Sequence, residues 1–299
     1  MSTTDRVATG STTGSPGPAA ATAAWLDRGG RLPGIARLTL VRAGVELRQF
    51  WRERDAVIFV FAYPIVMLAI FASVFGSEDQ GTEVAQIGFA QYFLPGMVAT
   101  GIMLTSFQSL AVSIAVERDD GTLRRLRATP LPVTAYVGGK VALTLATSVV
   151  QTALLLAVAA LAFDVPLPTD AGRWVTFAWV FALGAATGTV CGVGFSSLPR
   201  SGRSASAVVT PVVLVLQFIS GVFFAFFALP GWMQTLASVF PLKWIAQGMR
   251  SVFLPEEMAA LETSGSWQHP ATAAVLVAWL IVGLVVGVRT FRWRRRDDG

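Results

Sequence analysis

Six long apolar stretches constrain the fold of this chain more than any other feature of its sequence. Each holds about 18 to 25 residues without a central charge, enough to cross the roughly 30 Å hydrocarbon core of a bilayer as a helix. Composition agrees, since 54% of the residues are hydrophobic and 14% are charged, and the mean hydropathy is +0.60. The sequence therefore predicts an all-α, polytopic membrane protein with six transmembrane helices. They are expected over residues 56–75, 93–116, 141–163, 174–198, 205–229 and 271–288.

The basic residues predict how the chain is oriented in the membrane. Of its 23 lysines and arginines, 20 lie in the N-terminal segment, in the loops after the second and fourth apolar stretches, and in the C-terminal tail. Lys140 is among them, assigned to the loop before the third stretch. Because basic loops remain in the cytoplasm, we expect both termini on the cytoplasmic side. No nucleic-acid partner is expected, since the basic residues are spread over four segments beside the membrane rather than gathered on one face.

Four segments are expected along the chain. Residues 1–31 are mostly small or polar and predict a disordered cytoplasmic tail, because they bury too little apolar surface to offset the entropy of ordering. Residues 32–55 predict an amphipathic interfacial helix. Residues 56–289 form the six-span transmembrane domain, and residues 290–299 form a basic cytoplasmic tail.

The amphipathic segment is identified by its periodicity. Leu40, Leu47 and Trp51 recur at helical spacing, with Arg42 and Glu46 largely opposite. This pattern favours a helix that lies in the inner membrane interface before the first span. An ordinary solvated helix with some core contact is the alternative, because further apolar residues interrupt the polar face.

The segment before the last span contains two short apolar pieces, residues 232–240 and 244–253, separated by Pro241. Both are too short to span a bilayer, so they predict re-entrant or interfacial helices on the outer side. Trp232 and Trp244 have the character of residues that anchor such helices at the headgroup level.

Several residues within or near the spans are candidates for a substrate path or outer gate. The aromatic side chains at the outer end of the fifth span either meet lipid or line a hydrophobic gate, and the sequence does not separate these alternatives. Strongly polar glutamines also occur inside the spans. The candidates are Gln108, Gln217, Phe223, Phe224, Phe227 and Trp232.

Gly184, Gly188 and Gly192 give the fourth span a smooth face. This spacing lets another helix approach closely, either within the subunit or from a second subunit.

The sequence lacks the residue patterns of an enzyme active site, a metal site and a phosphate-binding loop. The predicted spans hold no Asp, Glu, Arg or His, and the chain has one cysteine, Cys191, and one histidine, His269. A disulfide within the chain and a metal site with recognisable ligand spacing are therefore excluded. The pair Gly139-Lys140 lacks the upstream glycine and the following Ser or Thr of a phosphate-binding loop. An enzyme active site is not expected, and the chain itself supplies no visible energy source.

The most distinctive charged stretch, residues 117–132, lies between the second and third spans. Leu123 and Leu126 share one face of a short helix, which predicts apolar contacts with a partner. Pro130 and Pro132 end that helix, because proline lacks an amide donor and disfavours helical geometry in the preceding residue. The alternative is a basic loop that only anchors its two spans.

This stretch carries a family resemblance. It reads Glu-Arg-Asp-Asp-Gly-Thr-Leu at 117–123 and Ala-Thr-Pro-Leu at 128–131, and the outer segment contains Leu229-Pro-Gly-Trp and Met249-Arg250. With the six-span layout, these motifs resemble the permease subunit of type-2 ABC exporters, in particular the bacterial drug-resistance (daunorubicin-type efflux) branch. Arg124 departs from the pattern, since the family often has an acidic residue there.

The resemblance implies a non-enzymatic transport subunit in a bacterial cell membrane. A separate ABC-type ATPase subunit would bind ATP and Mg, so no cofactor is expected in this chain, and the permease would pair with a second copy or a paralogue as a dimer. The exported compound would be an amphipathic drug or lipid. The coupling helix that docks on the ATPase would use Glu117, Gly121, Thr122, Leu123, Leu126 and Pro130.

Two other functions remain open from the sequence. One is an ion-coupled secondary exporter without an ATPase, although such a carrier normally holds an ionisable group at depth in the membrane. The other is a membrane scaffold that transports nothing.

Overall fold

The computed structural model describes residues 34–75, 87–129 and 131–290, and within these residues the regular structure is entirely helical. Six helical segments are long and apolar enough to cross a membrane, which confirms the predicted fold class. The second combines α4 (Phe89–Met103), the π-helical turn η1 (Leu104–Gln108) and α5 (Ser109–Asp119). The others are α3 (Arg54–Phe75), α7 (Val133–Ala162), α8 (Ala171–Phe195), α9 (Gly202–Ile219) and α12 (His269–Thr290).

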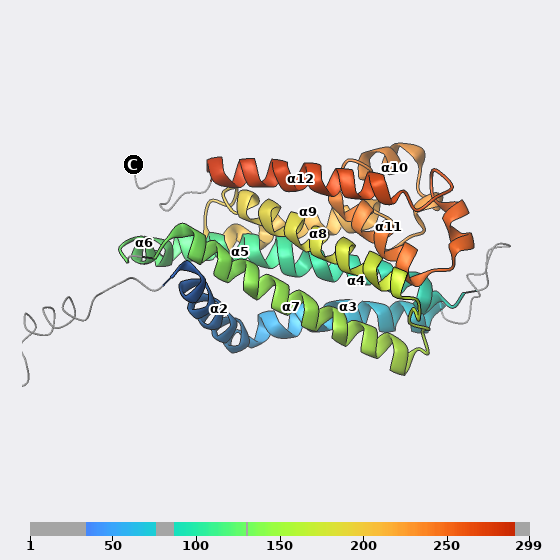
Figure 1. Cartoon of the computed structure of the whole chain (residues 1–299), viewed down its shortest axis with the longest axis horizontal. Coiled ribbons are helices and arrows are strands. Elements are labelled where there is room, and N and C mark those ends of the chain that lie inside the picture. The colour runs from blue at the N-terminus through green and yellow to red at the C-terminus, as the bar shows by residue number, and fades with distance from the viewer. Residues whose placement is uncertain (1–33, 76–86, 130, 291–299) are drawn as a thin grey trace, which may run out of the picture.

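The six spans lie side by side along the long axis of the molecule (Figure 1). The short helix α6 (Thr122–Arg127) and the oblique helix α2 (Ile35–Arg52) lie at one end, which we call the α6 end. Helices α10 (Gly231–Ala237) and α11 (Pro241–Phe253) lie at the opposite end, the α11 end. The expected disordered tail falls outside the described residues, as does nearly all of the basic C-terminal tail.

The second span forms the centre of the bundle. In its most apolar window 78% of the residues are buried, compared with 28% in α3 and 22% in α12. Phe93, Met97 and Ile102 are almost completely enclosed. The outer spans therefore face the surroundings with their apolar side chains, as transmembrane helices do in lipid.

The glycine face of α8 packs within the subunit. A Cβ atom on Gly188 would lie 2.0 Å from Ser106 Oγ, and one on Gly192 would lie 2.8 Å from the carbonyl oxygen of Phe107. Both contacts are with the η1 turn of the second span, while Gly184 lies against Ile245 of α11. Of the two alternatives, the structure supports close packing inside one chain.

The third span starts earlier than predicted, because α7 begins at Val133 and Lys140 lies in its second turn. The assignment of Lys140 to a loop is therefore wrong. Hydropathy places a charged residue outside a span, but this lysine is buried and its charge is paired with carboxylates of two other helices.

The fifth span ends earlier than predicted, because α9 stops at Ile219 and not near residue 229. Gly221 adopts φ +72°, a left-handed conformation that suits glycine at a helix end. The aromatic residues that follow lie in a turn and in the short 3-10 helix η2 (Phe226–Ala228) rather than on a transmembrane helix.

The two short helices predicted before the last span are present as α10 and α11. All residues of α11 are buried, and it packs between α4, α8 and α12, so it is enclosed by protein. By contrast, α10 lies at the surface and exposes Trp232. A 3-10 helix, η3 (Glu256–Leu261), connects this region toward α12.

Candidate functional site

A tight turn sets the position of α6 relative to the second span. Gly121 has φ +78°, a conformation that side-chain-bearing residues rarely adopt, and it joins α5 to α6. The Asp120 carboxylate accepts a hydrogen bond of 2.8 Å from the Thr122 amide, which satisfies a donor in the first turn of α6. The acidic-Gly-Thr sequence therefore fixes a short helix at the end of the span. Pro130 lies outside the described residues.

The apolar face of α6 points into the bundle. Leu123 is fully buried against Leu110, Ile114 and Tyr136, and Leu126 packs beside the same cluster. We expected this face to contact a partner, whereas here it fastens α6 to α5 and α7. The side chains of Arg124 and Arg125 are exposed instead.

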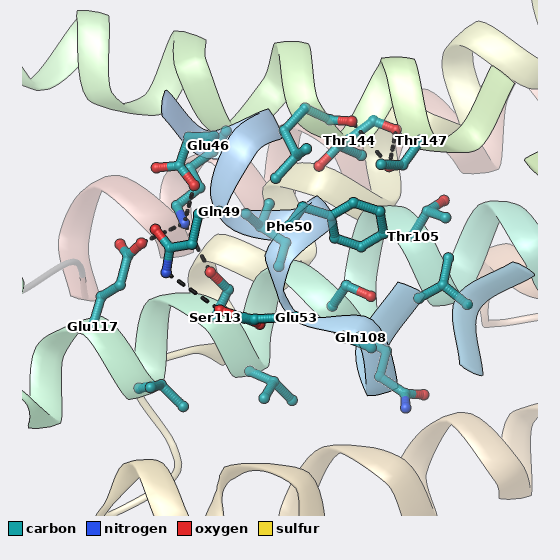
Figure 2. A pocket seen from close by; sticks show the side chains of 18 of the residues that line it. Glu46, Gln49, Phe50, Glu53, Thr105, Gln108, Ser113, Glu117, Thr144 and Thr147 are labelled. Atoms are coloured by element: carbon teal, nitrogen blue, oxygen red, sulfur yellow. Dashed lines mark hydrogen bonds and ion pairs between the residues drawn. The ribbon is translucent and has the colours of Figure 1, made fainter. Parts of the chain in front are cut away.

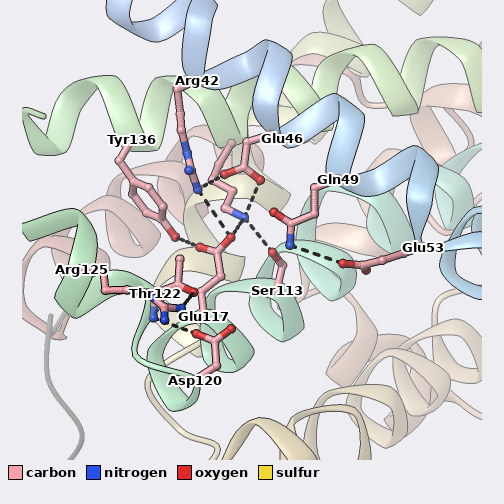
Figure 3. A network of polar contacts seen from close by, with 11 residues as sticks. Arg42, Glu46, Gln49, Glu53, Ser113, Glu117, Asp120, Thr122, Arg125 and Tyr136 are labelled. Atoms are coloured by element: carbon pink, nitrogen blue, oxygen red, sulfur yellow. Dashed lines mark hydrogen bonds and ion pairs between the residues drawn. The ribbon is translucent and has the colours of Figure 1, made fainter. Parts of the chain in front are cut away.

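A buried group of charged side chains lies next to this turn. Lys140 Nζ donates to Glu117 Oε1 at 2.7 Å and to Glu46 Oε2 at 2.8 Å, and the Tyr136 hydroxyl donates to Glu117 Oε2 at 2.7 Å. Arg42 pairs with Glu46 and lies 3.6 Å from Glu117 Oε1. Figure 3 shows Arg42 and Glu46 of α2, Glu117 of α5 and Tyr136 of α7 converging at one place. We call Arg42, Glu46, Glu117, Tyr136 and Lys140 the charge cluster.

The charge cluster is electrostatically balanced, with two carboxylates and two cations. Glu46, Glu117 and Lys140 each expose no more than 4% of their surface. Lys140 gains a third partner, the Ser113 hydroxyl of α5, at 2.8 Å. Removing one partner from a buried pair leaves an uncompensated charge, so the cluster ties the three helices together.

Two glycines of α7 allow α2 to reach the cluster. A Cβ on Gly139 would lie 2.5 Å from Arg42 Cγ, and one on Gly138 would lie 2.8 Å from Thr39 Cγ2. The close contact brings Glu46 within ion-pair distance of Lys140. The Gly139-Lys140 pair thus has a packing role.

Helix α2 turns Arg42 and Glu46 inward and leaves several large apolar side chains exposed. Leu40 is 71% exposed and Trp51 is 54% exposed, while Glu46 is 2% exposed. A water-solvated helix has the opposite arrangement, so this orientation suits a helix that lies at a membrane surface.

A cavity of about 250 Å³ opens beside the charge cluster, between α2, α3, α5, α7 and α9. In Figure 2, Glu46, Gln49 and Glu117 lie on one side of it, and Thr105, Thr144 and Thr147 lie on the other. Its lining is charged at the α6 end and apolar or hydroxyl-bearing further along. The residues that line it are Glu46, Gln49, Phe50, Glu53, Ala56, Phe59, Val60, Thr105, Gln108, Ser109, Leu110, Val112, Ser113, Val116, Glu117, Asp120, Lys140, Leu143, Thr144, Thr147 and Ser206.

The residues predicted to form a substrate path lie in different parts of the molecule and do not form one site. Gln108 lines the cavity, but Gln217 is buried and accepts a hydrogen bond of 3.0 Å from the Tyr63 hydroxyl, which joins α9 to α3. Phe223 packs among other aromatic rings, with Phe71 at 5.9 Å between ring centroids. The remaining candidates, Phe224, Phe227 and Trp232, are exposed near the α11 end.

A second buried ionic group stabilises the α11 end. Arg250 Nε donates to Glu262 Oε1 at 2.6 Å, and another of its nitrogens donates to the Gly221 carbonyl at 3.4 Å. These contacts connect α11 to the turn after α9. Lys243 lies nearby over the rings of Trp244 and Phe226, and burial lowers its pKa to about 8.

Sequence reasoning missed Arg42, Glu46, Tyr136 and Lys140 as functional candidates. One signal was available: the chain has only two lysines among its 23 basic residues, Lys140 and Lys243, and both are buried. The pairing itself was not visible, because Glu46 and Lys140 are 94 positions apart.

Comparison with known proteins identifies the family. The ABC-2 type transporter family matches residues 39–254, which include the charge cluster, α6 and α11. The chain is also similar to the inner membrane transport permease YadH of Escherichia coli (strain K12) and of Shigella flexneri. Each is 24% identical over 235 residues, which are 76% of this chain and 88% of that protein. Because the family match covers well over half of its length, this chain belongs to the ABC-2 type transporter family and is a membrane permease subunit of an ABC transporter.

Proposed function

We propose that this permease is the membrane part of an ATP-driven exporter. A separate ABC-type ATPase subunit, which binds ATP and Mg, docks at the α6 end. The permease acts as a dimer with a second copy or a paralogue, and it moves an amphipathic drug or lipid-like compound out of the cell. The name of its relative, an inner membrane permease, supports placement in a bacterial inner membrane.

The observation that carries this proposal is the attachment of α6 to two helices, α5 and α7, which the charge cluster in turn joins to α2. Leu123 fastens α6 to α5 and α7, and the charge cluster at the adjacent end of α5 joins both to α2. A force applied to α6 is therefore transmitted to the second and third spans without a flexible joint. This is the mechanical requirement for a helix through which an ATPase moves a permease.

The exposed surface of α6 supports a specific choice of docking residues. Since Leu123 is buried, contacts with the ATPase are made by Arg124, Arg125 and the turn at Gly121 and Thr122. The inward-facing leucines position the helix, and Glu117 transmits its movement through Lys140 and Tyr136.

A gentle-detergent pull-down from the native host tests the proposal. The wild-type permease is expected to retain an ABC-type ATPase, and the double variant Arg124→Glu and Arg125→Glu is expected to lose it. The matched control is Arg200→Glu with Arg203→Glu, two exposed arginines just before α9 and in its first turn. This control makes the same change in charge at the same end of the molecule but outside α6.

The proposed docking is contradicted if the α6 variant retains as much ATPase as the control does. Absence of any ATPase from the wild-type sample contradicts the exporter assignment itself.

One observation favours the second candidate, an ion-coupled exporter. Ionisable side chains, among them Glu46, Glu117 and Lys140, line the cavity at its α6 end. Their mutual pairing and the family assignment favour the ATP-driven mechanism. Transport that persists without ATP and stops when the proton gradient is collapsed would decide for the ion-coupled mechanism.

A further inference from the structure

We propose that the exposed face of α2 is a binding site for anionic phospholipid headgroups in the leaflet around the α6 end, where α2 lies (Figure 1). This inference does not depend on the compound that the permease carries or on its ATPase partner. Three observations carry it: arginines without an anionic partner among the described residues, apolar side chains on the same helix face, and the direct connection of α2 to the first span.

The exposed face of α2 combines arginines with apolar side chains. Its residues follow one another at alternating steps of four and three positions, and all of them are exposed. They are Arg37, Val41, Gly44, Arg48 and Trp51. Residues at this spacing share one side of a helix. The charge cluster holds the other side of α2 against α7, so the fold itself sets which face is turned outward.

Four arginines on or next to this face have no anionic partner in the described part of the chain. They are Arg37, Arg48, Arg52 and Arg54, and each is exposed. None of their guanidinium groups forms an ion pair or a hydrogen bond with another described residue. These groups can therefore pair with phosphate oxygens, which match the planar donor geometry of arginine.

Carboxylates in the same segment do not cancel this charge. Glu53 accepts a hydrogen bond from Gln49 at 3.4 Å and lines the cavity, so it lies toward the bundle. Asp55 lies in the first turn of α3, where a carboxylate interacts favourably with the positive end of the helix. Four arginines against these two carboxylates leave two positive charges in excess. The segment thus attracts a net negative headgroup more strongly than a zwitterionic one.

The connection to α3 places the arginines at the depth of the headgroups. Helix α2 ends at Arg52, and the first span, α3, begins at Arg54. Trp51 stacks on Phe61 of α3 with 6.0 Å between ring centroids, which ties the end of α2 to the span. Ile58, one turn into α3, exposes 64% of its surface, as a lipid-facing residue does. Arg52 and Arg54 therefore lie where the hydrocarbon core begins, a depth at which tryptophan is also typical.

The apolar part of the face favours a lipid leaflet over a soluble partner. Leu40 exposes 71% of its surface and Val41 exposes 61%. In a basic amphipathic helix at an interface, such side chains insert among the acyl chains while the arginines reach the phosphates. The ligand is therefore a phospholipid with a net negative headgroup, such as phosphatidylglycerol.

Photocrosslinking of the full chain in lipid nanodiscs tests this site without any ATPase. The discs are made of phosphatidylcholine and contain the same mole fraction of one probe, either a phosphatidylglycerol or a phosphatidylcholine with the same diazirine on an acyl chain near the glycerol. After chymotryptic digestion, mass spectrometry measures labelling of residues 35–58. We expect the anionic probe to label this segment at least about fivefold more than the zwitterionic one, and the ratio to fall as salt is added.

The triple variant Arg37→Gln, Arg48→Gln and Arg52→Gln should bring this ratio close to one. Lysine at the same three positions should keep most of it, because the positive charge is retained. Labelling of α12 by either probe should be the same in all variants, which verifies that each protein is folded and inserted.

The matched control is the triple variant Arg200→Gln, Arg203→Gln and Arg289→Gln, which removes three exposed arginines outside α2. Its ratio should equal that of the wild type. Equal labelling by the two probes in the wild type, an unchanged ratio in the α2 variant, or the same fall in the control would overturn the proposal. An α2 variant that keeps the ratio but loses the ATPase in the pull-down would assign this face to the ATPase instead.

Discussion

Lys140 is held by carboxylates from two other helices, at 2.8 Å from Glu46 and 2.7 Å from Glu117. Replacing it in Lys140→Met keeps most of its length but leaves those carboxylates facing each other without their shared cation. We expect the free energy of unfolding to fall by about 3–5 kcal/mol. Thermal unfolding of the purified permease in detergent measures this loss.

Two further variants test whether the loss of stability in Lys140→Met comes from losing the buried positive charge. Arg289→Met removes an exposed cation at the same end and should change stability by less than about 0.5 kcal/mol. Adding Glu117→Gln to Lys140→Met should recover part of the loss, because the remaining carboxylate then faces a neutral amide. A Lys140→Met protein as stable as the wild type would show that the cluster does not hold the helices together.

The environment of Lys243 leads to a prediction about pH. Among the described residues no carboxylate lies within ion-pair distance of its amine. Burial lowers the pKa of Lys243 from 10.5 to about 8. Between these values the unfolded chain binds more protons than the folded one. The free energy of unfolding therefore rises with pH from 8 to 10.5, and below pH 8 the folded protein carries the full penalty of a buried charge.

Lys243→Met should abolish this rise and stabilise the protein at neutral pH by about 1–3 kcal/mol. Denaturation midpoints of both proteins across the alkaline range give the comparison. Parallel pH profiles for the wild type and the variant would exclude Lys243 as the titrating group.

At the scale of elements, sequence predicted those helices whose limits are set by local chemistry. The turn at Gly121 and the prolines after α6 specify a short helix, which the structure has at Thr122–Arg127. Two apolar pieces, residues 232–240 and 244–253, are too short to span a bilayer and were therefore predicted as the short helices that the structure has as α10 and α11. In each case the deciding residues are neighbours in the chain.

Elements that depend on distant contacts were not predictable in the same way. The start of α7 at Val133 requires a buried Lys140, which is stable only because α2 and α5 supply its partners. The π-helical turn η1 lies where α8 presents Gly188 and Gly192. The charge cluster and the cavity combine residues from several helices, so periodicity along one helix does not reveal them.

The contact between α8 and η1 leads to a test at this scale. A Cβ on Gly188 would lie 2.0 Å from Ser106 Oγ and 2.9 Å from Ser106 Cβ, so Gly188→Ala must displace Ser106 or separate α8 from η1. We expect a loss of stability of about 1–3 kcal/mol from overpacking, measured by thermal unfolding. Combining it with Ser106→Ala should restore part of the stability, because the nearest clashing atom is removed.

Gly44→Ala is the matched control for Gly188→Ala, since no atom lies within 4 Å of the Cβ that it would add to α2. Alanine favours a helix more than glycine does, so this variant should be neutral or slightly more stable. If both alanine variants behave alike, the approach of α8 to η1 is not tight.

For the whole molecule, the two ends have different architecture. The α6 end holds the charge cluster, the cavity and the exposed Arg124 and Arg125, while the α11 end holds the enclosed helix α11 and the Arg250–Glu262 pair. The core between them is largely apolar, with a few buried polar residues such as Thr100 and Gln151. This asymmetry agrees with the exporter proposed above, in which the ATPase would act at the α6 end.

The basic residues predict that the α6 end faces the cytoplasm, and chemical labelling tests this orientation. In a Cys191→Ala background, single cysteines are introduced as Thr129→Cys near α6 and as Ser264→Cys near η3, both at exposed positions. A membrane-impermeant maleimide applied to spheroplasts should label the cysteine at 264, whereas the cysteine at 129 should react only after the membrane is opened. The background protein without cysteine controls for nonspecific labelling. Labelling of the cysteine at 129 in sealed spheroplasts would reverse the proposed orientation, and the arginines of α6 would then be out of reach of any cytoplasmic ATPase.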